Sequence, residues 1–248
     1  MAPSRNPSNS ARTIAGRFAS DGAAAARPVV VVHGLGLSSR YMDRFSRALV
    51  GVGPVYAVDL PGFGRSFRPE QPLDVPGLAD ALVAWMRGAG IGPAVLVGNS
   101  LGAQVVLDVA VRYPELAHRL VLIAPTVDVR ARTFRRQMVR VLLTSFLEPP
   151  GLIGLAWAAF ARCGARTIWR TVRSTLEDPV ERKLPLVRVP TLVVHGQRDR
   201  LVPLRWSSEV TRLLPRGRLR VVRGGHAPQY SNPVTVAGFV RELVEEPL

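Results

Sequence analysis

The chain has 248 residues, 47% of them hydrophobic, and its 33 Lys and Arg against 18 Asp and Glu give a net charge of +15. This length and composition predict one globular domain with a substantial core and exclude an intrinsically disordered protein. Because Cys163 is the only cysteine, the chain can form neither an internal disulfide nor a two-cysteine metal motif.

All the basic residues except Lys183 are arginines, and they are spread along the chain without a nucleic-acid motif. We therefore expect a solvated basic surface and no nucleic-acid partner. Residues 1–11 are polar and predict a disordered tail that lacks the apolar core of a signal peptide. The longest apolar stretch, residues 151–161, is far shorter than the ~20 residues that cross a bilayer, so we expect a cytoplasmic protein.

Short runs rich in Val, Ile and Leu alternate with helical patterns along the chain. The runs that predict buried strands are residues 28–32, 55–60, 94–97, 120–123, 192–194 and 219–222. Helical patterns lie near residues 39–50, 76–88, 101–112, 205–214 and 233–244. This alternation predicts an α/β fold with a doubly wound, mostly parallel sheet.

Residues 126–188 interrupt the alternation, because they contain no strand-like run. They are typical of helices separated at Glu148-Pro149-Pro150-Gly151 and at Asp178-Pro179. An insertion of this length immediately before the penultimate predicted strand is often an active-site lid. We therefore predict a helical lid over 126–188 and a core made of 12–125 and 189–248.

The sequence Gly98-Asn99-Ser100-Leu101-Gly102 has the form G-x-S-x-G and stands between a predicted strand and a predicted helix. This is the setting of a nucleophile elbow, a sharp turn that holds a serine hydroxyl above the sheet. Gly98 and Gly102 leave the turn free of side chains that would collide with the strand and the helix. The N–H of Leu101 then points at the developing oxyanion.

A second glycine-rich sequence, His33-Gly34-Leu35-Gly36, follows the first predicted buried strand. Gly34 and its neighbours allow this loop to fold close to the nucleophile, where a backbone N–H would be a second oxyanion donor. A flexible turn with Ser38 as a helix cap is the alternative interpretation.

A serine nucleophile needs a base, and only four histidines are present. His33 belongs to the glycine-rich loop, and His118 stands at the amino end of its strand, away from the edge where such sites form. His195 lies at the correct edge, but the glycine and the carboxylate that follow it suggest a supporting role. His226, between the last strand and the last helix, is the predicted base.

Asp199, just after the penultimate strand, is the predicted orienting acid. The order Ser100, Asp199, His226 is the nucleophile, acid, base order of α/β-hydrolases. Asp128, which follows the preceding strand at the same edge, is the alternative acid.

Five motifs together resemble the α/β-hydrolase superfamily, in the lid-bearing branch that contains esterases, lactonases, carbon–carbon bond hydrolases, epoxide hydrolases and haloalkane dehalogenases. They are HGLG at 33–36, DLPGFGRS at 59–66, GNSLG at 98–102, HGQRDRLVP at 195–203 and GGHAP at 224–228. The resemblance implies that the N–H groups of Leu35 and Leu101 form the oxyanion hole. It also implies that Asp59 anchors the loop beside the site.

Three departures from the family pattern carry information. Epoxide hydrolases and dehalogenases have an aspartate nucleophile, so Ser100 argues against both classes. Asn99 replaces the histidine common before the nucleophile, which favours carbon–carbon hydrolases. The strand hairpin usual before the HG loop is shortened, since only Thr13–Phe18 could contribute to it.

The predicted lid has a helix with two unlike faces. Its apolar face carries Phe134, Met138, Val141, Leu142 and Ser145, and its opposite face carries Arg132, Arg136 and Arg140. We expect the apolar face to cover the pocket and the arginines to meet water, with contact to an anionic membrane as the less favoured alternative. A second lid helix over residues 152–160, which include Trp157, predicts a substrate with an apolar acyl or alcohol group.

The predicted activity is that of a serine hydrolase of the carboxylic ester class (EC 3.1.1). It would cleave an ester, thioester or lactone through an acyl-Ser100 intermediate. Carbon–carbon bond hydrolysis of a diketone-like substrate is the first alternative, and a non-catalytic binding protein of the same fold is the second. The sequence contains no metal motif, phosphate loop or dinucleotide fingerprint, so we expect no metal and no cofactor.

Overall fold

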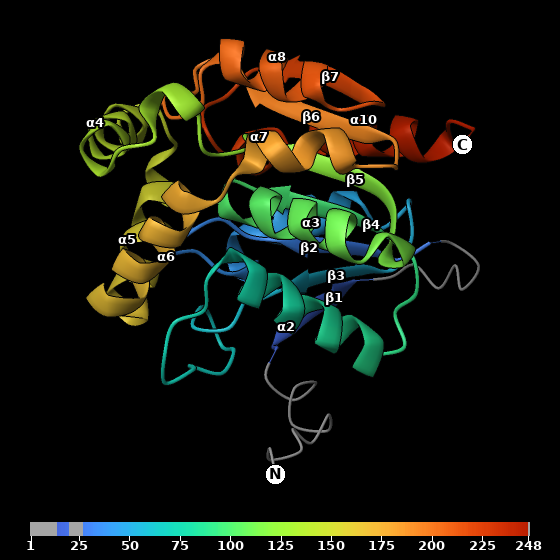
Figure 1. Ribbon diagram of the computed structural model, residues 1–248, viewed down its shortest axis with the longest axis horizontal. Helices are drawn as coiled ribbons and strands as arrows, with labels where there is room; N and C mark the ends of the chain where they lie inside the picture. Colours follow the sequence, from blue (N-terminus) through green and yellow to red (C-terminus); the bar gives the residue numbers. More distant parts are fainter. Residues whose placement is uncertain (1–13, 20–26, 248) are drawn as a thin grey trace.

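The computed structural model describes residues 14–19 and 27–247 (Figure 1). The predicted disordered tail, residues 1–11, lies outside the described residues. A seven-stranded sheet of order β1-β3-β2-β4-β5-β6-β7 forms the centre of the protein. Its strands are β1 (Gly16–Ala19), β2 (Val29–Val32), β3 (Val55–Val58), β4 (Ala94–Asn99), β5 (Ala117–Ile123), β6 (Thr191–Gly196) and β7 (Gly217–Val222).

Every pairing except that of β1 is parallel, as the alternation of strands and helices predicts. Strand β1 pairs antiparallel with β3, with Gly16 opposite Val58. In the part of the chain before the HG loop that the structure describes, the shortened hairpin corresponds to the four-residue edge strand β1. Parallel strands covered on both faces are apolar throughout, and the four valines of β2 are fully buried.

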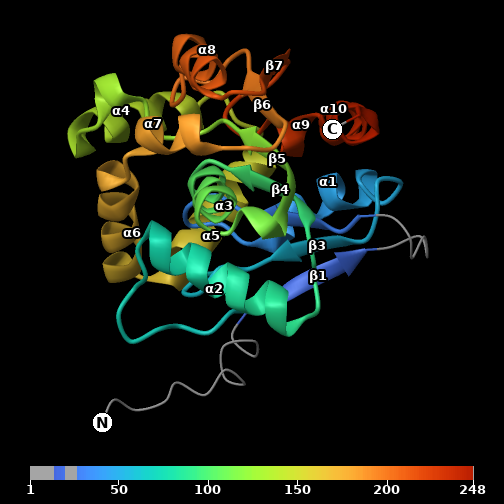
Figure 2. The same ribbon diagram turned by 45° about the vertical axis from the view of Figure 1, so that its right-hand side comes forward.

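Successive side chains of a strand point to opposite faces of the sheet, so β2 contributes to two cores. Val30 and Val32 belong to one core, while Val29 and Val31 belong to the other. Helices α2 (Val75–Gly88), α3 (Leu101–Arg112) and α8 (Leu204–Leu213) pack against the first face. Helices α1 (Asp43–Ala48) and α10 (Pro233–Glu245) pack against the second, and Figure 2 shows the two groups on opposite sides of the sheet. The sheet is doubly wound, as predicted.

Between β5 and β6 the chain forms helices without a strand. They are η4 (Val129–Ala131), α4 (Phe134–Ser145), α5 (Pro150–Cys163), α6 (Ala165–Glu177), α7 (Val180–Lys183) and η5 (Leu184–Leu186). Figure 1 shows α4, α5 and α6 together at one end of the molecule. The break between α4 and α5 falls at the predicted proline pair, because Pro150 occupies the first turn of α5, where a missing N–H costs nothing.

Three short helices complete the described chain. They are η2 (Ser39–Met42), η3 (Pro114–Leu116) and α9 (Pro228–Ser231). Helix η2 follows the HG loop, and α9 follows the loop of His226, so both lie close to the carboxyl ends of the strands.

Candidate active site

Ser100 occupies a sharp turn between β4 and α3, where the G-x-S-x-G motif predicts an elbow. Its backbone has φ +56° and ψ −115°, a strained conformation for a residue with a side chain. A Cβ on Gly98 would overlap the backbone of Gly102, and one on Gly102 would overlap the carbonyl oxygen of Val32. Both glycines are therefore required for β4, α3 and β2 to approach one another this closely.

The elbow is held from both sides. The Ser100 N–H donates to the Ile123 carbonyl on β5 at 3.0 Å, and the Ser100 carbonyl accepts from Ala103 in α3 at 3.0 Å. Ser100 is 9% exposed, and the first residue of α3 is Leu101. The N–H of Leu101 thus lies at the positive end of the helix dipole, beside the serine.

The HG loop passes directly over this turn. A Cβ added to Gly34 would lie 3.2 Å from the Asn99 Oδ1 and 3.4 Å from the Ser100 Cβ. Among the described residues, neither the Leu35 nor the Leu101 N–H donates a hydrogen bond. The two amides that the family resemblance assigns to an oxyanion hole are therefore available to a ligand.

His226 and Asp199 are in direct contact. The Nδ1 of His226 lies 2.8 Å from the Oδ2 of Asp199. Because an ionised carboxylate only accepts hydrogen bonds, the neutral imidazole has its proton on Nδ1, and its Nε2 then carries a free lone pair. Within the described residues Nε2 has no hydrogen-bond partner. The other oxygen of Asp199, Oδ1, accepts the N–H groups of Leu201 at 2.8 Å and Val202 at 2.9 Å.

The electrostatics of this pair favour a protonated imidazole. Burial lowers the pKa of His226, but the negative charge and hydrogen bond of Asp199, together with the charge of Glu148, outweigh burial and raise the pKa above its usual value. The Asp199 side chain is fully buried, and that of His226 is 15% exposed. These surroundings therefore stabilise the positively charged form of the His226 imidazole.

Asp128, the alternative acid, is engaged elsewhere. Its fully buried carboxylate pairs with Arg140 on α4 at 2.9 Å and with Arg205 on α8 at 2.5 Å. It also accepts the Arg130 N–H at 3.1 Å. Burial raises the pKa of Asp128, but these bonds outweigh burial and lower it below its usual range. Asp128 makes no hydrogen bond to His226, and it joins the helical segment to the core.

The other histidines near this edge have structural partners. His33 Nε2 accepts the Leu60 N–H at 3.0 Å, so its Nδ1–H donates to the Gly34 carbonyl at 2.8 Å. Burial lowers the pKa of His33, which keeps it neutral. His195 Nδ1 contacts the Ser207 Oγ at 3.1 Å, in line with the supporting role expected for it.

Asp59 ties the two loops beside the elbow. Its carboxylate accepts the Ser39 N–H at 2.5 Å and the Arg65 N–H at 3.0 Å. It is 1% exposed and has no contact with Ser100 or His226 among the described hydrogen bonds. These contacts match the anchoring role that the family resemblance implies.

Sequence reasoning missed a buried polar network beneath the elbow. The Asn99 Oδ1 accepts the Tyr41 hydroxyl at 2.6 Å, and its Nδ2 donates to the carbonyl oxygen of His226 at 3.2 Å. The Tyr41 oxygen accepts from the Gly34 N–H at 3.2 Å and from Gln229 at 3.3 Å. Burial raises the pKa of Tyr41, so its hydroxyl stays a donor. No local motif marks Tyr41 or Gln229, because the network joins three segments that are distant in the sequence.

Glu148 was also missed as a site residue. Its Oε1 accepts the backbone N–H of His226. One signal was present in the sequence: Glu148 is the only acidic residue between Asp128 and Glu177, in a stretch that contains nine arginines.

A cavity of about 430 Å³ opens beside His226. Its polar lining comes from Asn99, Thr144, Ser145, Glu148 and His226, and the remaining lining is apolar, most of it from α4 and α5. The apolar residues include Met138, Val141, Leu142, Leu152, Ile153 and Trp157. The predicted apolar face of α4 thus borders the cavity, except for Phe134, whose ring packs edge-on against Trp169 at 5.0 Å.

The expectation that Arg132, Arg136 and Arg140 only meet water is wrong for two of them. Arg140 reaches Asp128 and is 21% exposed, and Arg132 pairs with Glu181 at 2.6 Å and is 26% exposed. Arg136 is exposed and donates to the Arg130 carbonyl. Helical spacing placed Arg136 and Arg140 on one face of α4, but Arg132 precedes this helix. Spacing also could not show that carboxylates lie opposite Arg132 and Arg140.

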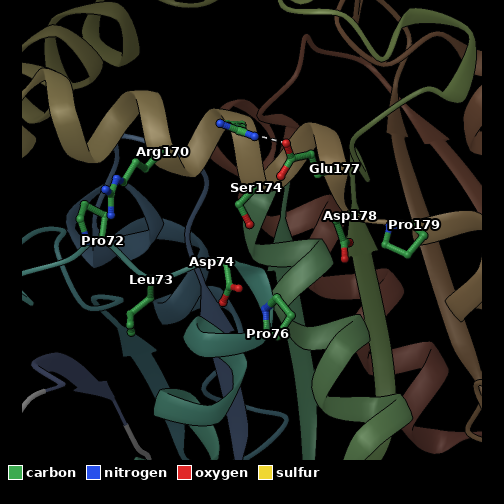
Figure 3. Close-up of a pocket in the computed structure, with 10 residues that line it drawn as sticks. Pro72, Leu73, Asp74, Pro76, Arg170, Ser174, Glu177, Asp178 and Pro179 are labelled. Atoms are coloured by element: carbon green, nitrogen blue, oxygen red, sulfur yellow. Dashed lines mark hydrogen bonds and ion pairs between the residues drawn. The ribbon is translucent and has the colours of Figure 1, made fainter.

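A second hollow lies where α6 meets the start of α2 (Figure 3). Ser174 accepts the Val75 N–H at 2.8 Å there, and Arg173 pairs with Glu177 at 2.7 Å. Because the Ser174 hydroxyl is engaged and no histidine lines this hollow, we interpret it as the junction between the helical segment and the core rather than as a reactive site.

The described residues contain neither a membrane-spanning helix nor a cluster of metal-binding side chains. No helix in ranges 14–19 and 27–247 is long and apolar enough to cross a bilayer. Likewise, no group of three His, Cys, Asp or Glu in that part of the chain is arranged to hold a metal ion.

Comparison with known proteins identifies the family. The family model described as "Alpha/beta hydrolase family" matches residues 29–239, which is most of the chain. The chain belongs to this family. The matched range includes the elbow, the HG loop, the helical segment and the loops of Asp199 and His226.

Curated relatives cover nearly the whole hydrolase. A pimeloyl-[acyl-carrier protein] methyl ester esterase of Neisseria meningitidis serogroup C is 30% identical, covering 89% of this chain and 94% of the relative. A putative carbamate hydrolase of Pseudomonas savastanoi pv. phaseolicola is 30% identical, covering 88% and 92%. The solved structure of a thermophilic esterase from Thermogutta terrifontis has a TM-score of 0.79 over 92% of each chain at 23% identity, a likeness in fold.

Proposed function

We propose that this hydrolase is a serine esterase that cleaves carboxylic esters, thioesters or lactones with an apolar moiety. The observation that carries the proposal is the contact between His226 Nδ1 and Asp199 Oδ2, which leaves Nε2 free at the cavity beside the strained Ser100 elbow. A base oriented by a carboxylate next to an elbow serine is the arrangement that activates a hydroxyl for attack.

In the first half of the proposed reaction, the Ser100 Oγ attacks the carbonyl carbon and its proton moves to His226 Nε2. The negative charge that develops on the carbonyl oxygen would be held by the N–H groups of Leu35 and Leu101. Asp199 fixes the imidazole in the required tautomer and stabilises its positive charge. His226 then gives the proton to the departing alcohol or thiol, and an acyl group remains on Ser100.

In the second half, water takes the place of the alcohol. His226 removes a proton from that water, which attacks the acyl carbon, and the tetrahedral intermediate collapses to release the acid and regenerate Ser100. No step needs a metal or an organic cofactor.

The apolar lining from α4 and α5 supports an apolar acyl or alcohol group, because such a cavity offers little to a sugar or a peptide. In this proposal, residues 126–188 act as a lid whose helices define substrate choice. The relatives that are methyl ester esterases support an ester as the scissile group.

A fluorophosphonate probe tests the nucleophile. We expect a single label on Ser100 and none in Ser100→Ala, with the far-ultraviolet circular dichroism unchanged. A label that survives the substitution would remove Ser100 from the role. No label on the wild type would favour the non-catalytic alternative.

A substrate panel tests the reaction class. We expect hydrolysis of p-nitrophenyl esters of varied acyl length to exceed hydrolysis of a vinylogous diketone by orders of magnitude in kcat/KM. The reverse ranking would favour carbon–carbon bond hydrolysis, which the same three residues can support.

A further inference from the structure

Glu148 connects the helical segment to the loop of the proposed base. It stands between α4 and α5, and its Oε1 accepts the backbone N–H of His226. Gly225 makes this approach feasible, because a Cβ at that position would overlap the Glu148 carboxyl group. The glycine before the histidine is thus explained by a partner 77 residues earlier in the chain.

His226 is consequently held at three points by three parts of the chain. Asp199, after β6, holds the imidazole ring, and Asn99, at the end of β4, donates to the backbone carbonyl. Glu148 accepts the backbone N–H. Two of the three anchors belong to the core, and the third belongs to the segment that borders the substrate cavity.

We propose that Glu148 is a positioning residue, whose carboxylate fixes the backbone of His226 and ties the orientation of the base to the seating of α4 and α5. This inference rests on the proposed function. A purely structural hydrogen bond would not need a carboxylate, since a main-chain or amide oxygen would accept the same N–H group. The negative charge of Glu148 is what a neutral acceptor would not provide.

The surroundings of Glu148 make that charge costly. Its Oε2 is buried and, among the described residues, has no hydrogen-bond partner. None of the nine arginines between Asp128 and Glu177 hydrogen-bonds to it in the described structure. Burial raises the pKa of Glu148, against the opposing effect of His226. The positive charge that reaches His226 during catalysis is therefore the natural counterion.

Other titratable groups also face the imidazole, and the test has to separate them from Glu148. Asp199 and His195 approach from β6 and the loop after it, whereas Tyr41, on η2, faces Glu148. Of the two carboxylates that raise the pKa of His226, Asp199 contributes more than Glu148. Substitution of Glu148 removes its contribution to the pKa of His226 and leaves the hydrogen bond between the imidazole and Asp199 in place.

The experiment compares wild type with Glu148→Ala, Glu148→Gln and the control Glu177→Gln. Glu177 is a lid carboxylate on the surface whose side chain is 63% exposed, so its loss should change nothing. The measurements are kcat and KM on p-nitrophenyl butyrate, and the rate at which a fluorophosphonate labels Ser100, each across a pH series.

We expect Glu148→Ala to lower kcat and the labelling rate on the order of 10²-fold, with a smaller change in KM, because the base loses its backbone anchor. Glu148→Gln keeps an acceptor oxygen and should recover most of that loss. In both variants the acid limb of the pH profile should move to lower pH, because the charge of Glu148 no longer supports the imidazolium.

Unchanged rates and an unchanged pH profile in folded Glu148→Ala would overturn the proposal. A loss that Glu148→Gln does not recover, with the acid limb unmoved, would also overturn it. If Glu148→Ala does not fold, the proposal is judged from Glu148→Gln alone, whose acid limb must move to lower pH. Should the wild type not label at all, the proposed function fails instead, and an NMR titration of His226 in wild type and Glu148→Gln still tests the effect of the charge.

Discussion

The guanidinium of Arg140, on α4, lies 2.9 Å from the buried carboxylate of Asp128 at the edge of the sheet. The same nitrogen is 3.3 Å from the Leu201 carbonyl, in the loop that carries Asp199. Arg140 thus joins the helical segment both to the β5 edge and to the loop of the proposed acid. This buried polar contact anchors α4 to the core.

We predict that Arg140→Gln lowers the free energy of unfolding by about 2 kcal/mol, the scale of a hydrogen bond to a charged group. The loss stays below that of a fully broken buried pair because Arg205 still holds Asp128. Arg136→Gln, on the same face of α4 but exposed, is the matched control and should change stability little. Urea unfolding measures both, and equal effects in the two variants would contradict the role of Arg140.

Exchanging each carboxylate for its amide should separate the two candidate acids. Asp199→Asn should lower kcat by about 10⁴-fold, because an amide at this position favours the wrong tautomer of His226. Asp128→Asn should lower kcat far less and lower stability instead, because its partners are arginines. Steady-state kinetics and urea unfolding on both variants check this, and the opposite pattern would move the acid to Asp128.

The pH dependence of kcat/KM follows from the raised pKa of His226. The base acts only when neutral, so activity falls as the pH drops through that pKa. We therefore expect the acid limb above the ordinary histidine value of about 6.5. Asp199→Asn should move the limb to lower pH, because the larger of the two stabilising charges is gone. An acid limb centred below pH 6.5 in the wild type would show that the effect of burial on the pKa of His226 outweighs that of the two carboxylates.

The close approach at the elbow predicts a strong effect of one methyl group. Gly98→Ala places a Cβ against the Gly102 backbone, so β4 and α3 must separate. We expect a loss of about 1–3 kcal/mol in stability from overpacking, together with a large loss of kcat. Gly154→Ala, in α5 with no atom within 4 Å of the new methyl, should instead be neutral or stabilising by up to about 1 kcal/mol. Thermal unfolding distinguishes the two.

Much of the sheet could be predicted from the sequence, because the strands between its two edges are largely buried on both faces and so are continuously apolar. All six predicted runs are strands, although β3 ends at Val58, two residues earlier than expected, where the chain turns toward Asp59. The sequence alone could not decide which of Asp128 and Asp199 is the orienting acid, since both follow neighbouring strands at the same edge. Only their partners distinguish them, and those lie 12 to 77 residues away.

The polar contacts of the helical segment were beyond sequence reasoning for a related physical reason. The period of a helix shows which side chains share a face, but not what lies opposite that face. Arg132 and Arg140 therefore looked solvated, although both reach carboxylates. Glu148 likewise looked like part of a helix break, and its contact with His226 depends on how two distant loops meet.

The position of His226 after β7 has a consequence for synthesis on the ribosome. Ser100 leaves the ribosome 126 residues before its proposed base, and Asp199 leaves it 27 residues before. Every strand of the sheet has therefore been made before the serine can be activated. In a partly synthesised chain, the Ser100 hydroxyl would therefore have no base and would be unreactive. It would become reactive only once the loop of His226 has folded against the sheet.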